Sequence, residues 1–340
     1  MTDITSKILV TGATGYVGRR LIRMLAETYG ASSILCLAYD QADNELERTG
    51  RANLDALGIR FIPVDLVSGR GLADVPKSPS IVFHLASNTD TAATDHTIND
   101  VGTRNLLEAI QPLPPEAHFI FTSTIAVADH RVDDRRPVDE DTPLLRPFNN
   151  YGRRKLAAEK YLRERAQMDG LRSTIVRLCA VYGRGTRVGG LFERLSHLVS
   201  VDSVIVRFNY PGKLSLINVD DIARILVLLS RRTEPSATFE LFIPVAEVLT
   251  IAELIQCYYR AFGTDYRPIR LPSLFWEFCN LVARNLYRVE PLLPHVVNNR
   301  IWQLGLLVGG GFHNESEKIF RTFPELKLKR FKDAAVEIAG

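Results

Sequence analysis

The segment from Lys7 to Arg20 constrains the fold of this chain more than any other part of the sequence. A short apolar run, Lys7–Thr11, leads directly into Gly12-Ala13-Thr14-Gly15-Tyr16-Val17-Gly18, and a helical pattern begins inside that loop. Glycine at 12 and 15 allows a sharp turn and a close backbone approach to a ligand, and Gly18 lets the helix pack on the strand. Unpaired N–H groups and the positive dipole end of the helix suit phosphate. The segment therefore predicts a pyrophosphate-binding turn for a dinucleotide.

The first half of the chain alternates short apolar runs with stretches of helical length. Because strands that alternate with helices form a parallel sheet covered on both faces, we expect a doubly wound α/β fold of the Rossmann type. The carboxyl ends of its strands lie at one edge, where ligands bind. The expected strands are Lys7–Thr11, Ile34–Ala38, Arg60–Val64, Ile81–Leu85, His118–Ser123 and Ser173–Leu178, and the expected helices are Tyr16–Tyr29, Asp100–Gln111 and Tyr151–Gln167.

This alternation stops after Tyr182. Four glycines in 183–190 indicate a loop, and the region from Leu249 onward is mostly helical and irregular. Between them we expect strands at Ser203–Phe208 and Leu214–Val219 and a helix from Asp220. The chain length suits one sheet-based domain with a smaller addition. We expect residues 1–178 to form the dinucleotide-binding domain, with 212–245 returning to it, and 179–211 and 246–340 to form a smaller, mostly helical substrate-binding part.

Composition excludes several classes of function. The net charge is only +3 and the basic residues are scattered, so we expect no nucleic-acid partner. No run of 18 apolar residues exists, and the polar stretch Met1–Lys7 does not resemble a secretory signal. Four widely spaced cysteines without a Cys-x-x-Cys pair suit thiols in a reducing, cytoplasmic compartment: Cys36, Cys179, Cys257 and Cys279. We expect no metal site.

A candidate catalytic pair stands at the start of a helical stretch, Tyr151-Gly152-Arg153-Arg154-Lys155. A spacing of four places both side chains on one helix face. An ammonium beside a phenol favours the phenolate, so the pKa of the tyrosine falls from its usual value near 10. Such a tyrosine can exchange a proton with a substrate oxygen while a hydride moves to or from a nicotinamide. Because this short pattern also arises by chance, it needs support. That support is Thr122-Ser123-Thr124, hydroxyl residues that end a buried strand at the ligand edge.

Taken in order, these motifs resemble the extended branch of the short-chain dehydrogenase/reductase superfamily, the NAD-dependent epimerase/dehydratase-like enzymes. The Gly-x-x-Gly-x-x-Gly spacing is typical of that superfamily. The resemblance runs from Lys7 to Ala223, and the joint order of the motifs is far more specific than any one of them. Further segments that match in the right order are Asp65-Leu66, His84–Ser87, Asn99–Leu107, Arg177–Gly183 and Val219–Ala223.

The resemblance implies roles for individual residues. Tyr151 would be the acid/base, and Lys155 would lower its pKa and hold the nicotinamide ribose. Thr124, with Ser123 as the second choice, would orient the substrate oxygen, and Asn99 would support a proton path through its backbone or water. The residues expected to bind the cofactor are Gly12, Thr14, Gly15, Tyr16, Val17, Gly18, Asp40, Asp65, Leu66, Leu85, Ala86 and Ser87, together with Tyr151 and Lys155.

The cofactor is expected to be NAD(P)(H), and the residues favour NAD slightly. Rossmann proteins usually end the second strand with an acid for the NAD ribose or an arginine for the NADP phosphate. Here those positions match Ala38 and Tyr39, so neither signal is clean. Asp40 could reach the ribose. The nearby acids Asp43, Glu45 and Glu47 would repel a 2′-phosphate. The nearby arginines Arg19 and Arg20 would attract one.

Three departures from the family pattern speak against a sugar-nucleotide substrate. Ala180 stands where the sugar enzymes usually carry asparagine, and Leu214 where they carry arginine for the diphosphate. Ile125-Ala126 follow Thr124 where the 4,6-dehydratases have an acid pair. We therefore favour an oxidoreductase that acts on a hydrophobic or lipid-like alcohol or ketone. The alternative is a nucleotide-sugar epimerase that uses Lys213, Arg184 or Arg187 for phosphate. A non-catalytic dinucleotide sensor is a third interpretation, which an intact Thr124, Tyr151 and Lys155 disfavour.

The C-terminal region is unusually apolar and aromatic. Leu271–Tyr287 contains phenylalanine, tryptophan and several leucines, and Ile301–Phe312 is uncharged. One interpretation is core packing or a dimer surface. The other is an apolar substrate pocket, or a lid on a membrane surface with Arg284 and Arg288 at the headgroups, which gives peripheral membrane contact through 271–312. The resemblance also implies a homodimer, formed through Asn99–Ile110 and Tyr151–Arg165.

Overall fold

The computed structural model describes residues 7–39, 45–129, 136–185, 190–233, 237–288, 293–309 and 313–339. The chain divides into two compact units. The first comprises Met1–Thr124, Arg153–Arg177 and Ile222–Phe242, and the second comprises Ile125–Gly152, Leu178–Asp221 and Ile243–Gly340. Relative to the domains expected from the sequence, the second unit also includes 125–152, and the return to the first unit is limited to 222–242.

The first unit is built on a seven-stranded parallel sheet of order β3-β2-β1-β4-β5-β6-β9. This arrangement confirms the Rossmann prediction. The register places Thr11 opposite both Leu37 and His84, and His84 opposite Phe121, so the carboxyl ends of the central strands share one edge. The strands are β1 (Ile8–Thr11), β2 (Ile34–Tyr39), β3 (Arg60–Val64), β4 (Ile81–His84), β5 (His118–Thr124), β6 (Arg172–Leu178) and β9 (Phe239–Phe242).

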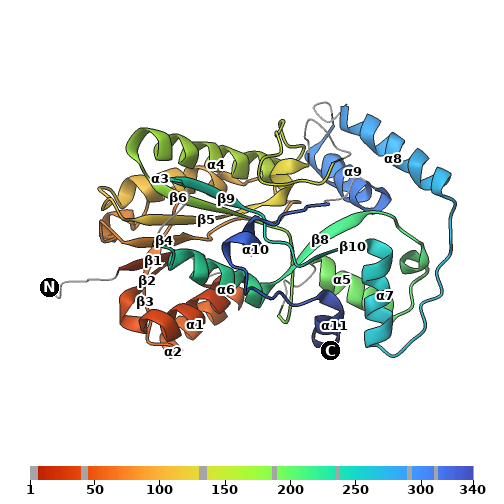
Figure 1. Cartoon of the computed structure of the whole chain (residues 1–340), viewed down its shortest axis with the longest axis horizontal. Coiled ribbons are helices and arrows are strands. Elements are labelled where there is room, and N and C mark those ends of the chain that lie inside the picture. The colour runs from red at the N-terminus through yellow and green to blue at the C-terminus, as the bar shows by residue number, and fades with distance from the viewer. Residues whose placement is uncertain are drawn as a thin grey trace. The chain divides into compact units, whose positions relative to one another are not determined.

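Helices cover both faces of this sheet (Figure 1). The figure shows α1, α2 and α6 on one face and α3 and α4 on the other. Helix α1 buries Leu21, Ile22 and Leu25, which are spaced to form one helical stripe against the sheet. The bounds are α1 (Gly18–Tyr29), α2 (Glu45–Ala56), α3 (Val101–Ala109), α4 (Asn150–Asp169) and α6 (Val219–Ser230), with short 3-10 turns at Ala31–Ser33, Leu72–Asp74 and Thr97–Asn99.

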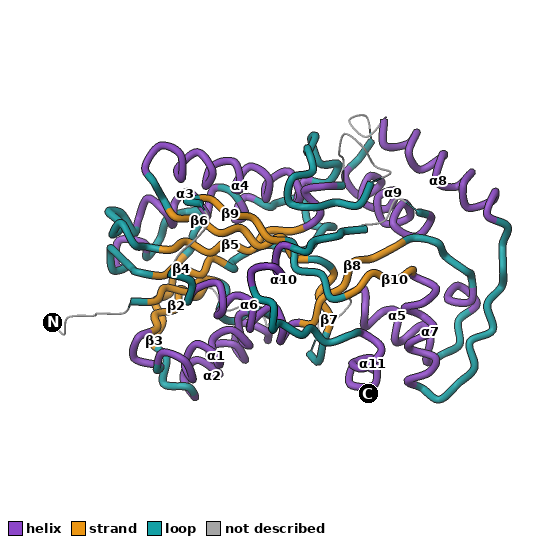
Figure 2. The backbone as a smooth tube through the Cα atoms, viewed as in Figure 1, coloured by secondary structure: helices purple, strands orange, loops and turns teal. Residues whose placement is uncertain are grey.

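The second unit has its own three-stranded sheet of order β10-β8-β7 (Figure 2). Strand β8 pairs antiparallel with β10 and parallel with β7. An apolar core lies between this sheet and three helices, and the Phe331 ring lies 5.0 Å from the Tyr182 ring and 5.4 Å from the Tyr258 ring. The bounds are β7 (Ala180–Tyr182), β8 (Lys213–Asn218), β10 (Glu247–Thr250), α5 (Leu191–Ser200), α7 (Ile251–Ala261), α8 (Ser273–Arg288), α9 (His295–Val308), α10 (Lys318–Thr322) and α11 (Phe331–Ala339).

Two elements of the second unit differ from expectation. The strand predicted at Ser203–Phe208 is wrong, because Val204–Arg207 is a 3-10 turn. Within that turn only Val206 is buried, and Phe208 forms a single isolated bridge to Ile269 rather than a ladder. Residues 125–128 also form a 3-10 turn, at Ile125–Ala128, where the sequence predicts no element. Across the described ranges, no helix is both long and apolar enough to cross a bilayer.

Candidate active site

The glycine loop after β1 has no room for side chains at two positions. Gly12 has a φ of +69°, and a Cβ there would lie 2.6 Å from the backbone nitrogen of Ala86. A Cβ at Gly18 would lie 2.0 Å from the carbonyl oxygen of Gly12. The N–H of Gly15 donates to the same Gly12 carbonyl at 3.1 Å and closes the turn into α1. The loop is therefore a backbone-only cradle ahead of a helix N-terminus, which fits a dinucleotide pyrophosphate.

A chain of hydrogen bonds beneath this loop fixes the tautomer of His84. The Thr103 hydroxyl donates to the Asn99 carbonyl at 3.0 Å, so its oxygen must accept from His84 Nε2, 2.9 Å away. His84 Nδ1 therefore accepts a hydrogen bond from the Thr11 hydroxyl at 2.7 Å. The Thr11 oxygen in turn accepts from the Ala86 N–H at 3.1 Å. This series of hydrogen bonds connects the ends of β1 and β4 to the start of α3.

His84 is neutral in this setting. Its ring is fully buried, and burial, followed by the positive charge of Lys155, lowers its pKa from 6.5 to about 3. Asn99 serves the same region through its side chain, because its Oδ1 accepts from the Ser87 hydroxyl at 2.8 Å and the Asn88 N–H at 3.0 Å. The structure therefore places Asn99 as the residue that holds the segment after β4, with its carbonyl already accepting from Thr103.

Lys155 is buried to 1% exposure on α4 and is held against β5. Its Nζ donates to the carbonyl oxygen of Thr122 at 2.9 Å and lies 4.5 Å from the centre of the Phe121 ring, on which His84 also stacks. Burial lowers the pKa of Lys155 from 10.5 to about 7, and the negative charge of Glu159 opposes this. Burial therefore makes the charged form of Lys155 much less favourable than that of a lysine in water.

Tyr151, also buried, stands in the first turn of α4, and that turn is held by residues that the sequence motifs do not indicate. Asn149 caps the helix, because its Oδ1 accepts from the Gly152 N–H at 2.6 Å. The Asp129 carboxylate in turn accepts from the N–H of Phe148 and from Asn149 Nδ2. A Cβ at Gly152 would lie 2.6 Å from the Ala126 carbonyl oxygen, so glycine allows this close packing. An asparagine just before a helical run is a start signal that could have identified the cap.

Two of the predicted residues, Thr124 and Lys155, lie at this edge of the sheet in the first unit. Thr124 is buried at the carboxyl end of β5, two residues beyond the Thr122 carbonyl that binds Lys155. Tyr151 lies one helical turn before Lys155 on α4. Alternation along β5 places Ser123 on the opposite face from Thr122 and Thr124. The Ser123 hydroxyl is buried and has no hydrogen-bond partner among the described residues. Thr124 and Ser123 as substrate-orienting groups remain predictions.

Helix α2 places an acid against the glycine loop. The Thr14 hydroxyl donates to Glu47 Oε2 at 2.7 Å, and a Cβ at Gly50, one turn later, would lie 2.5 Å from the Thr14 Cβ. The expected ribose residue Asp40, like Asp43, lies outside the described residues. Tyr39 is exposed at the end of β2.

The segment after β3 forms a compact turn. Asp65 accepts from the N–H groups of Val67 and Ser68 and from the Ser68 hydroxyl. Leu66 is buried, and its carbonyl accepts from Asn105 Nδ2 at 2.8 Å. Contact of this turn with adenine remains a prediction.

The sequence comparison decides the family. Residues 8–241 match the model of the NAD dependent epimerase/dehydratase family. The chain belongs to this family. Because the match covers the Rossmann sheet, the glycine loop and α4, the fold and the resemblance carried by the motifs are both confirmed.

Known members of the epimerase/dehydratase group differ in how much of this chain they match. A UDP-glucose 4-epimerase from Mycolicibacterium smegmatis is 29% identical over 52% of this chain, which spans 56% of that relative's length. A ceramide reductase from Caulobacter vibrioides is 27% identical over 80% of this chain and 75% of the reductase. A vestitone reductase from Medicago sativa is 25% identical over 81% of this chain and 90% of the reductase.

The same fold occurs in a solved UDP-glucuronic acid 4-epimerase from Bacillus cereus. That structure superposes with a TM-score of 0.74 at 18% identity and covers 98% of this chain and 97% of its own. At this identity the likeness shows the fold alone.

Two positions that were compared above with sugar-nucleotide enzymes, Leu214 and Ala180, are apolar and packed here. Leu214 on β8 is 5% exposed and belongs to the core of the second unit. Ala180, on β7, is half-buried against the same core. Lys213 and Arg184 are exposed, and Arg187 lies outside the described residues.

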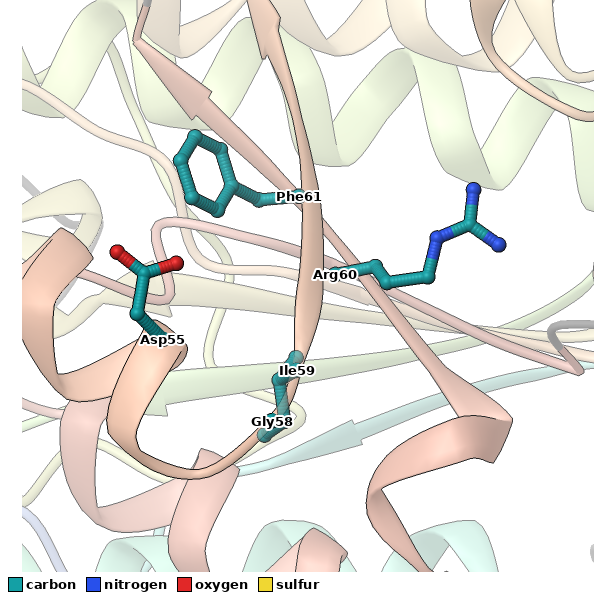
Figure 3. Close-up of a pocket in the computed structure, with 5 residues that line it drawn as sticks. All are labelled: Asp55, Gly58, Ile59, Arg60 and Phe61. Atoms are coloured by element: carbon teal, nitrogen blue, oxygen red, sulfur yellow. The ribbon is translucent and has the colours of Figure 1, made fainter.

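A pocket elsewhere in the first unit is separate from this site (Figure 3). It is lined by Asp55, Gly58, Ile59, Arg60 and Phe61, at the amino end of β3. The figure shows Asp55 and Phe61 on one side of the strand and Arg60 pointing to the other. Because dinucleotides bind at the carboxyl ends of strands, this pocket takes no part in the chemistry of the candidate active site.

Proposed function

We propose that this chain is an NAD(P)-dependent oxidoreductase that interconverts a hydrophobic or lipid-like alcohol and its ketone, with Tyr151 as the acid/base. The observation that carries the proposal is the buried Lys155, held 2.9 Å from the Thr122 carbonyl and one helical turn after Tyr151. In this proposal the Lys155 ammonium acts on Tyr151, one helical turn before it, and the substrate oxygen lies at Thr124, the last residue of β5. A buried lysine at the ligand edge of the sheet is costly without such a role.

The proposed chemistry assigns one task to each side chain. The bound nicotinamide supplies or accepts the hydride. During reduction the Tyr151 hydroxyl gives its proton to the substrate oxygen, and during oxidation the phenolate takes that proton back. Charged Lys155 favours the phenolate through a field that water does not screen. The Thr124 hydroxyl holds the substrate oxygen, and Lys155 would also hold the nicotinamide ribose. The backbone cradle at Gly12 and Gly18 would hold the pyrophosphate.

We favour NAD over NADP for this site. Glu47 on α2 contacts the glycine loop, because its carboxylate accepts a hydrogen bond from Thr14. It would add a negative charge where the adenosine half of the cofactor would bind. A 2′-phosphate would be repelled by that carboxylate, whereas ribose hydroxyls can donate to it. The assignment of Asp40 to the ribose stays a proposal from the sequence.

Two observations support an apolar substrate. Leu214 is buried in an apolar core where the sugar enzymes carry a diphosphate-binding arginine. In addition, the ceramide and vestitone reductases match about four fifths of this chain, whereas the UDP-glucose 4-epimerase matches about half. A buried leucine offers no partner for a phosphate.

A nucleotide-sugar epimerase is the alternative. The 29% identity to a UDP-glucose 4-epimerase favours it, and exposed Lys213 and Arg184 would supply the phosphate contacts. The two proposals differ in their redox balance. An oxidoreductase changes the oxidation state of its nicotinamide once per product molecule, whereas an epimerase restores it in every turnover.

The test is nicotinamide absorbance measured beside product formation, with long-chain alcohols and ketones and with UDP-sugars. We expect a stoichiometric absorbance change with an apolar substrate. Interconversion of a UDP-sugar without net change in nicotinamide would refute the oxidoreductase. Tyr151→Phe should abolish turnover and leave dinucleotide binding near normal, while Tyr161→Phe on the same helix should leave both unchanged. Retained turnover in Tyr151→Phe would remove Tyr151 from its role.

A homodimer through α3 and α4 and a cytoplasmic location complete the proposal. Sedimentation of the purified chain measures the first of these. A sedimenting species of monomer mass would contradict the dimer.

A further inference from the structure

Helix α8 carries its large apolar side chains on the outside of the second unit. Figure 1 shows α8 beside α9. Six apolar residues of α8 are between 39% and 74% exposed, and their spacing of three, four or seven places most of them along one side of the helix. These residues are Leu274, Phe275, Phe278, Leu281, Val282 and Leu286. Core packing, one of the two interpretations of this segment, therefore does not account for them.

The rotation of α8 about its axis is fixed by its inner side. Trp276 is buried there, and its Nε1 donates to Asn209 Oδ1 at 3.3 Å. The same Asn209 amide accepts from the Leu271 N–H at 2.8 Å and donates to the Leu271 carbonyl at 3.2 Å. Ala283, two turns beyond Trp276, is also buried. The apolar side therefore cannot turn inward without breaking the Trp276–Asn209 hydrogen bond and exposing Trp276 and Ala283.

Helix α9 packs on α8 and adds exposed Val296, Val297 and Leu304. Its C-terminal end is anchored, because the Gly212 N–H donates to the Leu307 carbonyl at 3.0 Å. A Cβ at Gly212 would lie 1.8 Å from the Leu306 carbonyl oxygen, so only glycine permits this approach. We call the nine exposed apolar residues of the two helices the α8–α9 face. Single exposed apolar residues are ordinary on protein surfaces, whereas this face contains nine of them on two adjacent helices.

Exposed arginines outnumber exposed acids on α8, on α9 and in the segment before α8, among the described residues. The arginines are Arg267, Arg270, Arg284 and Arg300, the acids are Asp265 and Glu277, and Arg267 lies 4.0 Å from Asp265. A second copy of the chain, docked through the same face about a two-fold axis, would bring these arginines toward one another. An anionic lipid surface complements them, and apolar side chains between basic ones are the pattern of helices that lie in a membrane interface.

We infer that the α8–α9 face binds the surface of an anionic lipid bilayer, with its leucine, valine and phenylalanine side chains among the acyl chains and its arginines at the headgroups. Binding itself does not depend on the reaction. The consequence for catalysis, that the enzyme takes an apolar substrate from the bilayer, rests on the proposed function.

Flotation of the full chain with lipid vesicles tests this inference. We expect the wild type to float with vesicles of equal parts phosphatidylcholine and phosphatidylglycerol, and less with phosphatidylcholine alone or at high salt. Phe278→Glu combined with Leu281→Glu should lower the bound fraction at least tenfold. The matched control is Val336→Glu, an exposed valine on α11, which should float like the wild type. Arg267→Glu with Arg270→Glu should weaken binding to the anionic vesicles only.

Two further measurements keep the outcomes separate. NADH fluorescence should show unchanged dinucleotide binding in every variant, because the substituted side chains are exposed and far in sequence from the glycine loop. If wild-type protein stays in the soluble fraction with the anionic vesicles, the inference is overturned. It is also overturned if the Phe278/Leu281 variant converts a sedimenting dimer into a monomer, because the occupant is then a second copy. Vesicle binding without turnover of any alcohol or ketone would refute the proposed function and leave this inference standing.

Discussion

Replacing Lys155 by methionine should raise the stability of the protein at neutral pH while abolishing turnover. Burial lowers the pKa of Lys155 from 10.5 to about 7. Relative to the unfolded chain, the folded protein therefore disfavours the charged amine by about 5 kcal/mol. Methionine removes this penalty and fills a similar volume. It also leaves the Thr122 carbonyl without its 2.9 Å partner, which costs about 1–3 kcal/mol. The expected net gain at pH 7 is therefore about 2–4 kcal/mol.

The pH dependence of this difference has a definite sign. Between about pH 7 and pH 10.5 the unfolded chain holds a proton on Lys155 that the folded chain has lost, so wild-type stability rises with pH by about 1.4 kcal/mol per pH unit. Below about pH 7 both states are protonated and this contribution becomes flat. Lys155→Met lacks the slope altogether. From pH 7 to pH 9 the wild type should therefore gain about 2 kcal/mol on the variant, which corresponds to about 3 °C in Tm for a chain of this length.

The assay is thermal unfolding at a series of pH values, without added dinucleotide. Lys160→Met is the matched control, because Lys160 is an exposed lysine on the same helix and should give a curve parallel to the wild type. Parallel curves for wild type and Lys155→Met between pH 7 and pH 9 would refute the reasoning. A variant less stable than the wild type at pH 7 would show that the hydrogen bond to Thr122 outweighs the cost of burying the charge.

Three smaller substitutions test other parts of the site. Glu47→Gln keeps an acceptor for Thr14 but removes the charge, so the ratio of kcat/KM for NADP to that for NAD should rise about tenfold; an unchanged ratio would exclude Glu47 from cofactor choice. Thr103→Val should cost about 1–3 kcal/mol in urea unfolding by leaving the Nε2–H of His84 unpaired, whereas Thr103→Ser should retain most of the stability. Asn149→Ala should cost about 1 kcal/mol and lower kcat with little change in dinucleotide affinity, and a normal kcat would show that α4 holds Tyr151 without its cap.

The fold could be predicted because the first unit has strong local signals. All six of its predicted strands are present, with ends that differ by a residue or so, since each is a β-branched or aromatic run bounded by a turn. Helix α2 is not predicted, because Glu45–Ala56 is mostly polar and carries a glycine, Gly50, in its middle. Its position depends instead on the approach of Gly50 to Thr14, a contact between residues 36 apart. Strands β7, β9 and β10 are three or four residues long, too short to show a period.

The candidate site is predictable only where a single motif carries the information. The glycine loop and the Tyr151–Lys155 spacing are local, so they stand out in the sequence. The partners of those residues are not local, since Thr11 and His84 are 73 positions apart and Lys155 and Thr122 are 33 apart. Nothing in the pattern of His84-Leu85-Ala86-Ser87 indicates which ring nitrogen carries the proton. That follows only from the direction in which Thr103 donates.

The tautomer and the charge of His84 have a consequence for Lys155. Both groups lie against the Phe121 ring, and a buried pocket of low dielectric cannot hold two positive charges a few ångströms apart without a large penalty. His84 is the group that stays neutral, because its two ring nitrogens are already satisfied by Thr11 and Thr103 in the uncharged form. A proton added at Nδ1 would face the Thr11 hydroxyl proton, so protonation would require that hydroxyl to rotate and accept instead of donate. These hydrogen bonds therefore favour a neutral His84 and leave the positive charge of this pocket to Lys155, which we propose acts on Tyr151.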